Sequence, residues 1–247
     1  MLEYSPAACL PWMNNVASDC PFELVAIDLD GTLVDSVGDL HTAVSTMLNA
    51  MTMQPVTIDD VRHWVGNGID RLVHRALTRS MSENAESVLF ETAMVLFQDA
   101  YQAVNGQQSC LYPDVARGLE WLATLNTPMV VVTNKAARFA NPLLEVLKID
   151  QFYEVCIAGD HVANKKPDPG ALLLAASRCH ANPRHSVLIG DSISDMKAAH
   201  AAGFSSISVS YGYNHGQSVR TVQGKTKSDA IIDSFSELPA VFKQMSM

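Results

Sequence analysis

The chain has 247 residues, 48% of them hydrophobic, which is enough to bury a sizeable core. Its 17 basic and 26 acidic residues give a formal net charge of -9, which argues against broad electrostatic binding to nucleic acid or to an anionic membrane surface. A site for an anionic substrate would therefore need local positive charge, from a metal ion or from a few placed cations.

The five cysteines favour a cytoplasmic location. They are dispersed, with no Cys-x-x-Cys pair and no histidine at zinc-ligand spacing, which suits a reducing compartment. No apolar segment has the length of a membrane span, and the first residues lack the basic region and long apolar core of a secretory signal. We expect residues 1–21, which include Pro6, Pro11 and Pro21, to form an irregular N-terminal extension.

The first predicted strand is the apolar run Leu24–Ile27, which ends on two carboxylates and a glycine, Asp28, Asp30 and Gly31. Such a run is typical of a strand buried on both faces of a parallel sheet. Side-chain alternation places Asp28 and Asp30 on the same side, at the carboxyl end of the strand, where open α/β sheets bind ligands. Taken alone, Asp-x-Asp is also what a solvated turn of an acidic chain presents, so the rest of the chain must decide.

Residues 39–106 predict helices only. Apolar residues recur at helical spacing over residues 39–51 and again from Leu89 to Val104. Between these stretches, Gly66-Asn67-Gly68 predicts a tight loop.

Strands and helices then alternate to the end of the chain. The expected strands are Met129–Thr133, Phe152–Ala158, Ser186–Ile189, Ser206–Ser210 and Ala230–Ile232. This alternation predicts an α/β fold, a Rossmann-like parallel sheet sandwiched by helices. The helical segment 39–106 interrupts it after the first strand, so we expect a core of residues 22–38 and 107–247 with an inserted all-helical cap of residues 39–106.

Polar residues follow four of the predicted strands, and in a parallel sheet these ends lie along one edge. They are Asp28 and Asp30, Thr133 and Asn134, Lys165 and Lys166, and Asp191 with Asp195. Carboxylates, a hydroxyl, an amide and an ammonium together suit a hard divalent cation and a phosphoryl group, because Mg²⁺ takes oxygen ligands. The sequence therefore predicts a Mg²⁺ and phosphate site at this edge.

In order and context these residues resemble the four motifs of the haloacid dehalogenase superfamily of phosphohydrolases, over roughly residues 22–240. The matching segments are Asp28–Thr32, Thr133-Asn134, Lys166-Pro167 and Gly190–Asp195. The resemblance implies hydrolysis of a small phosphorylated metabolite. It also implies that Asp28 attacks phosphorus to form an aspartyl-phosphate, while Asp30 first gives and then takes a proton.

The resemblance further implies that Mg²⁺ is held by the side chains of Asp28 and Asp191 and by the backbone carbonyl of Asp30. Lys166 would neutralise the phosphoryl oxygens, and Thr133 with the backbone N–H of Asn134 would bind another of them. An alkoxide leaving group needs a proton and a halide does not, so Asp30 favours phosphate-ester hydrolysis over dehalogenation.

Several of these residues also have simpler interpretations. Thr133 could cap a helix, and Lys165 and Lys166 could be a solvated surface pair, an interpretation that we keep for Lys165. Asp195 is expected to orient metal-bound water or to begin the next helix.

Two further segments, Trp64–Gly68 and Tyr211–Gly216, are similar to those of bacterial phosphoglycolate phosphatases, which implies hydrolysis of 2-phosphoglycolate to glycolate and phosphate. The loop N–H groups of Gly66, Asn67 and Gly68 could bind the substrate carboxylate, with Arg71 or Arg62 supplying charge, although each could equally be a turn or surface residue. One departure is Asp168, where many relatives place a histidine.

Other substrates and one other class of function stay open at this point. The same fold could cleave a sugar phosphate, a nucleotide or pyrophosphate, or could act as a non-catalytic phosphate sensor. The sequence leaves the oligomeric state, monomer or homodimer, undecided.

Overall fold

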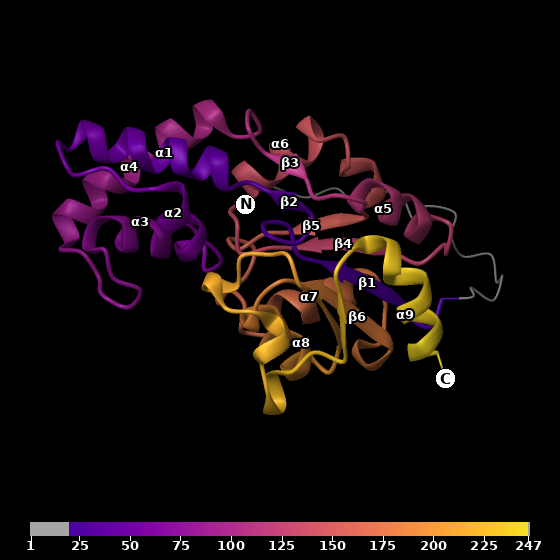
Figure 1. Ribbon diagram of the computed structural model, residues 1–247. Coiled ribbons are helices and arrows are strands. Elements are labelled where there is room, and N and C mark those ends of the chain that lie inside the picture. Colours follow the sequence, from indigo (N-terminus) through magenta and orange to yellow (C-terminus); the bar gives the residue numbers. More distant parts are fainter. Residues whose placement is uncertain (1–19, 247) are drawn as a thin grey trace.

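The computed structural model describes residues 20–246, so the expected N-terminal extension, apart from Cys20 and Pro21, lies outside the described residues. Its elements form a central sheet with helices on both faces and a separate group of helices to one side (Figure 1). Within residues 20–246, no helix is long and apolar enough to cross a membrane.

The central sheet is parallel throughout and has the strand order β5-β4-β1-β6-β7-β8. Its strands are β1 (Leu24–Ile27), β4 (Met129–Val132), β5 (Val155–Ile157), β6 (Ser186–Gly190), β7 (Ser205–Val209) and β8 (Ala230–Ile232). Each corresponds to one of the six predicted strands. The strand that carries Asp28 at its end lies in the middle of the sheet, paired with β4 on one side and β6 on the other.

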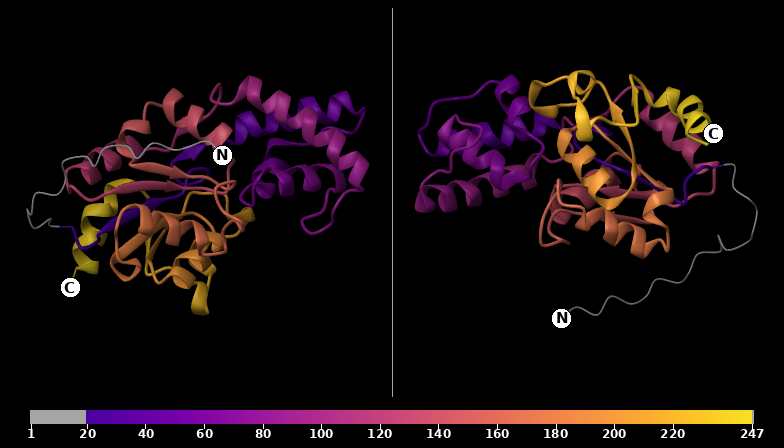
Figure 2. Two further views of the ribbon diagram at one scale, coloured as in Figure 1. Left: turned by 180° about the vertical axis from the view of Figure 1, so that it is seen from behind. Right: turned by 90° about the horizontal axis from the view of Figure 1, so that it is seen from below.

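Two helical layers cover the sheet, because successive residues of each strand point to opposite faces. From β1, Val25 and Ile27 pack with α5 (Val115–Ala123), α6 (Ala137–Val146) and α9 (Leu238–Met245). Leu24 and Ala26 pack on the other face with α7 (Gly170–Arg178) and α8 (Ile193–Ala202). Seen from the other two directions, the sheet again lies between these layers (Figure 2), which confirms the predicted Rossmann-like sandwich.

Four helices that follow β2 in the chain form a cluster beside the sheet, and we keep the name cap for them. They are α1 (Val37–Ala50), α2 (Ile58–Trp64), α3 (Ile69–Thr78) and α4 (Ser87–Val104). Their core includes Met47, Leu48, Val73 and Phe97, all fully buried. Figure 1 shows this cluster to the left of the sheet. The same apolar cluster includes Phe139 of α6 and Tyr213, so the cap packs directly against the α/β core.

A short two-stranded ribbon, which the sequence pattern did not predict, connects the cap to the core. Strands β2 (Val34–Asp35) and β3 (Cys110–Leu111) pair antiparallel, with Val34 opposite Leu111 and Asp35 opposite Cys110. Apolar periodicity cannot indicate strands of two residues.

Beside this ribbon, a buried carboxylate ties the two connections together. Asp39, in the first turn of α1, accepts hydrogen bonds from the backbone N–H groups of Gly106 (2.8 Å), Gln108 (2.8 Å) and Ser109 (3.1 Å), and from the Ser109 hydroxyl. The chain therefore enters and leaves the cap at a single fixed place.

Short 3₁₀ helices complete the core. They are η1 (Asp150–Phe152), η2 (Pro183–His185), η3 (Asn214–Gly216), η4 (Val219–Thr221), η5 (Gly224–Thr226) and η6 (Phe235–Glu237).

Candidate active site

The loop after β1 turns sharply and brings Asp28 and Asp30 to one cleft. The N–H of Asp28 still donates to Ile189 of β6 (2.9 Å), and the chain then folds back so that the N–H groups of Leu33 and Val34 both reach the Leu29 carbonyl (3.0 Å each). Gly31 has φ +88°, and a Cβ at this position would lie 2.5 Å from Asp191 Oδ2. Only glycine fits here, because the turn and the neighbouring carboxylate both exclude a side chain.

Three buried carboxylates meet around Lys166. Oxygens of Asp28, Asp191 and Asp195 lie within 4.8 Å of one another. The ammonium of Lys166 lies 2.7 Å from Asp28 Oδ1 and 2.7 Å from Asp195 Oδ1, and it donates to the Val132 carbonyl at 2.7 Å. All three N–H donors of Lys166 are therefore used. When all three carboxylates are ionised, their negative charge exceeds the single positive charge of Lys166. This excess of negative charge on oxygen atoms suits a hard divalent cation.

Burial shapes the pKa values in this cluster. Burial, followed by the charge of Asp195, raises the pKa of Asp191 to about 7. Burial also raises the pKa of Asp28 above its ordinary value, although the Lys166 ammonium opposes this effect. For Lys166, burial alone would lower the pKa, but the Asp195 and Asp28 carboxylates outweigh it and raise the pKa. A cation bound to these carboxylates would offset the cost of their ionisation.

Two of the carboxylates are oriented by their own loops. Asp195 Oδ2 accepts from the backbone N–H (3.0 Å) and hydroxyl (2.6 Å) of Ser192, a capping box that begins α8 and leaves Oδ1 for Lys166. Asp191 Oδ2 accepts from the N–H of Tyr213 at 2.7 Å. The expectation that Asp195 begins the next helix agrees with this geometry. The Tyr211–Gly216 segment lies against the acidic cluster.

Asp30 is held by a lysine that the sequence analysis did not single out. Its Oδ1 lies 2.7 Å from Lys135 Nζ and accepts a hydrogen bond from Ser36 Oγ at 2.5 Å. Lys135 is buried, and its Nζ also lies 5.1 Å from the centroid of the Tyr101 ring on cap helix α4. The one feature of the sequence that could have pointed to Lys135 as a site residue is its position directly after Thr133-Asn134.

Thr133 and Asn134 join the core loops to the cap. Thr133 Oγ1 accepts from the backbone N–H of Lys135 (3.1 Å) and keeps its own hydroxyl proton to donate. Asn134 Oδ1 accepts from the Lys166 N–H (2.8 Å), while Nδ2 donates to the carbonyls of Lys166 (3.0 Å) and Gly66 (3.0 Å). The Asn134 side chain therefore fixes the backbone of Lys166 and the cap loop at once.

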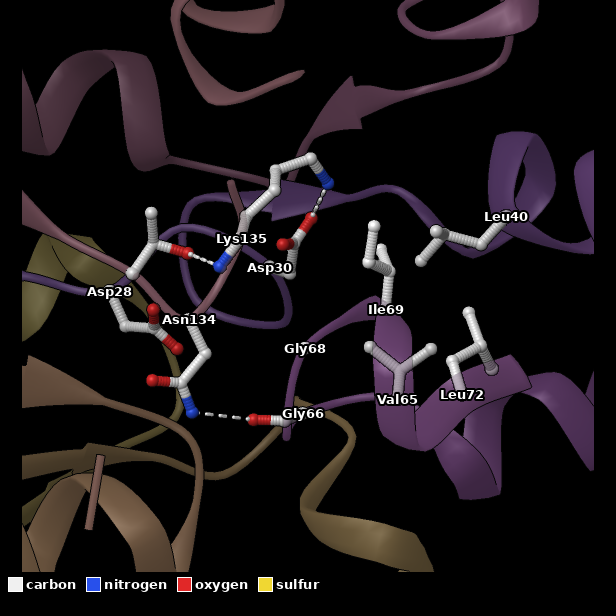
Figure 3. Close-up of a pocket in the computed structure, with 11 residues that line it drawn as sticks. Asp28, Asp30, Leu40, Val65, Gly66, Gly68, Ile69, Leu72, Asn134 and Lys135 are labelled. Atoms are coloured by element: carbon white, nitrogen blue, oxygen red, sulfur yellow. Dashed lines mark hydrogen bonds and ion pairs between the residues drawn. The ribbon is translucent and has the colours of Figure 1, made fainter. Parts of the chain in front are cut away.

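Core and cap together enclose a cleft with about 430 Å³ of free space, open solvent included (Figure 3). The core contributes polar and charged residues, namely Asp28, Asp30, Thr133, Asn134 and Lys135. The cap contributes an apolar wall and two glycines, namely Leu40, Val65, Gly66, Gly68, Ile69 and Leu72. The polar and charged side chains of the core therefore face the apolar side chains of the cap across this cleft.

The other cap residues considered from the sequence point elsewhere. The Asn67 side chain accepts from Arg75 (2.8 Å) and approaches Ser194 Oγ (3.5 Å). Arg62 pairs with exposed Asp59, and Arg71 donates to Asn84. Neither arginine lines the cleft.

Arg75, which the sequence analysis did not consider, has a structural position beneath the cap loop. Its buried guanidinium donates to the carbonyls of Trp64 and Met81 and to Asn67. Lys165 is partly exposed and reaches the cap through an ion pair with Asp70 (3.0 Å). The loop Gly66-Asn67-Gly68 is therefore fixed from both the cap and the core.

The parallel sheet, the inserted helices and the aspartates after β1 and β6 define a class of hydrolase, and comparison with known families agrees. The pattern of the family described as haloacid dehalogenase-like hydrolase matches residues 25–209, and the chain belongs to this family.

The names of individual relatives are more specific than the name of the family. The phosphoglycolate phosphatase of Nitrosococcus oceani is 43% identical over 222 residues, covering 90% of this chain and 97% of the relative. That of Pseudomonas putida is 43% identical over 217 residues, covering 87% and 78%. Among solved structures, a predicted phosphoglycolate phosphatase from Haemophilus somnus has a TM-score of 0.82 and 29% identity, covering 90% of this chain and 98% of that one.

Proposed function

We propose that this protein is a Mg²⁺-dependent phosphomonoesterase that hydrolyses 2-phosphoglycolate to glycolate and phosphate through an aspartyl-phosphate. The observation that carries the proposal is the pairing of two carboxylates, Asp28 and Asp30, in one cleft, each held by its own buried lysine. The relatives from Nitrosococcus oceani and Pseudomonas putida, both named phosphoglycolate phosphatase, support the choice of substrate.

In the first step, an Asp28 carboxylate oxygen attacks phosphorus and the bond from phosphorus to the ester oxygen breaks. Asp30 gives a proton to the departing glycolate oxygen. Lys166, 2.7 Å from Asp28 Oδ1, holds the nucleophile and lies where negative charge gathers on the phosphoryl oxygens. The products of this step are glycolate and the aspartyl-phosphate.

In the second step, water attacks the phosphorus of the aspartyl-phosphate and releases phosphate. Asp30 is now a carboxylate and takes the proton of this water, which restores both residues to their starting states. The apolar cap wall of Val65, Ile69 and Leu72 excludes other water from the cleft.

Mg²⁺ would be held by the Asp28 and Asp191 side chains and by the backbone carbonyl of Asp30. The buried carboxylate oxygens of Asp28, Asp191 and Asp195 support a cation here. When bound, the ion supplies positive charge to the transferring phosphoryl group.

The substrate would lie between the core and the cap loop. Thr133 Oγ1 and the Asn134 N–H would bind phosphoryl oxygens, and the Gly66-Asn67-Gly68 loop would contact the glycolate end through its N–H groups. Because Gly66 and Gly68 line the cleft while the Asn67 side chain is engaged by Arg75, we assign these contacts to the loop backbone. The small cleft favours a small metabolite over a nucleotide.

A panel of small phosphomonoesters that includes 2-phosphoglycolate, a sugar phosphate, a nucleotide and an aryl phosphate tests the proposal. We expect the highest kcat/KM with 2-phosphoglycolate, loss of turnover with EDTA and recovery with Mg²⁺. Asp28→Asn should fold normally and lose turnover by at least about a thousandfold, as removal of a nucleophile does. Substantial turnover by Asp28→Asn, or turnover that EDTA leaves unchanged, would contradict the mechanism.

A further inference from the structure

The two buried lysines of the site have different surroundings. Lys166 gives its three N–H donors to three oxygen acceptors, each at 2.7 Å. The Lys135 ammonium pairs with Asp30 Oδ1 at 2.7 Å and otherwise contacts the Tyr101 side chain, so two of its three donors are directed at these partners. An ammonium has three donors, and a buried cation needs acceptors for them. Lys135 therefore has donor capacity left for a ligand.

Lys135 also has the right position to meet a ligand. It lines the cleft together with Asp30, and of the lining residues within 20–246 it alone is cationic. In Figure 3, its side chain reaches over Asp30 on the side of the cleft that Leu40 and Ile69 close. On this side of the cleft a negatively charged part of the substrate would contact apolar side chains, and Lys135 would be its positively charged partner.

We propose that Lys135 is the specificity-determining residue that binds the carboxylate of the substrate. This inference rests on the proposed function, in which Asp30 protonates the ester oxygen. In 2-phosphoglycolate the carboxylate is attached to the carbon that bears this oxygen. A residue that binds the carboxylate must therefore lie next to the residue that serves the oxygen, and Lys135 Nζ lies 2.7 Å from Asp30 Oδ1.

The charges of the cleft make such a cation necessary. Asp28 enters the reaction as a carboxylate and lines the same space, so it repels a substrate carboxylate that enters between it and the cap. Arg62 and Arg71 do not line the cleft and are paired elsewhere. Lys135 is fixed in place by Asp30 and by the Tyr101 ring, so little side-chain freedom is lost when it binds a ligand.

The test compares 2-phosphoglycolate with 2-phosphoglycolamide, in which a neutral amide replaces the carboxylate. The measured quantity is the ratio of their kcat/KM values at neutral pH with saturating Mg²⁺. Lys135→Met should lower this ratio by about 10- to 100-fold, the usual value of a hydrogen bond to a charged group. Any loss that acts through Asp30 lowers both substrates alike and cancels in the ratio.

Lys243→Met is the matched control. It removes the same charge from an exposed position on α9, which does not line the cleft. The control should keep the wild-type ratio. If Lys135→Met does not fold, as judged by circular dichroism, Lys135→Gln keeps an N–H donor for Asp30 without the charge and should show the same fall.

The outcomes separate this inference from the proposed function. A folded Lys135 variant with the wild-type ratio, or an equal fall in Lys243→Met, would overturn the assignment of Lys135 while leaving the phosphatase intact. A wild-type enzyme that does not prefer the carboxylate over the amide would instead refute phosphoglycolate as the substrate, and the carboxylate subsite with it.

Discussion

Replacing Asp39 tests whether one buried carboxylate holds the two cap connections together. The side chain is fully buried; Oδ1 accepts from the Gln108 N–H, and Oδ2 accepts from the N–H groups of Gly106 and Ser109 and from the Ser109 hydroxyl. Asp39→Ala removes every acceptor, and Asp39→Asn replaces one oxygen by an N–H donor. The two variants should therefore differ in a graded way.

The size of each effect follows from these bonds. In Asp39→Ala, water can reach the exposed Gln108, but the N–H groups of Gly106 and Ser109 lose their partner in a more enclosed place. At about 1–3 kcal/mol for each unsatisfied buried donor, the free energy of unfolding should fall by about 2–6 kcal/mol. Asp39→Asn can turn its oxygen toward Gly106 and Ser109 and lose the Gln108 bond alone, so it should cost about 0.5–1.5 kcal/mol, the net contribution of one hydrogen bond.

Urea unfolding followed by circular dichroism measures these changes, and hydrogen exchange of residues 105–109 locates them. Exchange of the Gly106 and Ser109 amides should accelerate in Asp39→Ala, and exchange of the Gln108 amide should accelerate in both variants. Asp99→Ala, which removes an exposed carboxylate from cap helix α4, is the control and should stay within about 0.5 kcal/mol of wild type. Equal stabilities of Asp39→Ala and Asp99→Ala, or unchanged exchange at residues 105–109, would refute the reasoning.

Three other predictions concern the site and its loops. Since the pKa of Asp191 is raised from 3.8 to about 7, the folded protein without metal binds this proton more tightly than the unfolded chain does, and the stability from this group is lost as pH rises from about 4 to 7. Mg²⁺ should therefore raise Tm more at pH 8 than at pH 5.5, and equal shifts at both would contradict this explanation. Arg75→Met leaves Asn67 without its donor and should raise KM more than it lowers kcat, with a loss of about 2–4 kcal/mol in unfolding free energy; an unchanged KM would show that Arg75 does not position the loop. In Gly212→Ala the new Cβ would lie 2.1 Å from Asp191 Cβ and 2.5 Å from the Gly31 carbonyl, so the Tm increase with Mg²⁺ should disappear, and a normal increase would mean that the loop relaxes without moving Asp191.

The sheet was predictable because its signals are local. Strands β1, β4 and β6 are mostly apolar and buried on both faces, and each ends in or is followed by the glycine or polar residues that the turn requires. The predicted third strand, Phe152–Ala158, is longer than β5 because Phe152 belongs to the 3₁₀ helix η1. The ribbon of β2 and β3 escaped prediction because two residues show no period.

The site was predictable where roles follow strand ends and unpredictable where they depend on distant partners. Asp28 and Asp191 come directly after strands, so their meeting follows from the topology. Lys135 pairs with a carboxylate 105 positions away in the chain, and local sequence does not distinguish a buried lysine of this kind from a solvated one. Arg62 and Arg71 are the opposite case, because the sequence suggested them as substrate-binding residues and the structure directs them away from the cleft. Their side chains bind exposed neighbours, and these contacts cannot be inferred from sequence spacing.

The pairing of Val34 with Leu111 and of Asp35 with Cys110 brings the start and the end of the helical insertion side by side. Everything between these two pairs could be exchanged as a unit, because a replacement segment would need only to begin and end at the same place. The nucleophile and the acidic cluster would stay as they are, since their backbone belongs to the sheet edge. A chimaera that joins a cap from another member of the family between Ser36 and Ser109 would show whether substrate choice is inherited with the cap while the phosphoryl chemistry is inherited with the core.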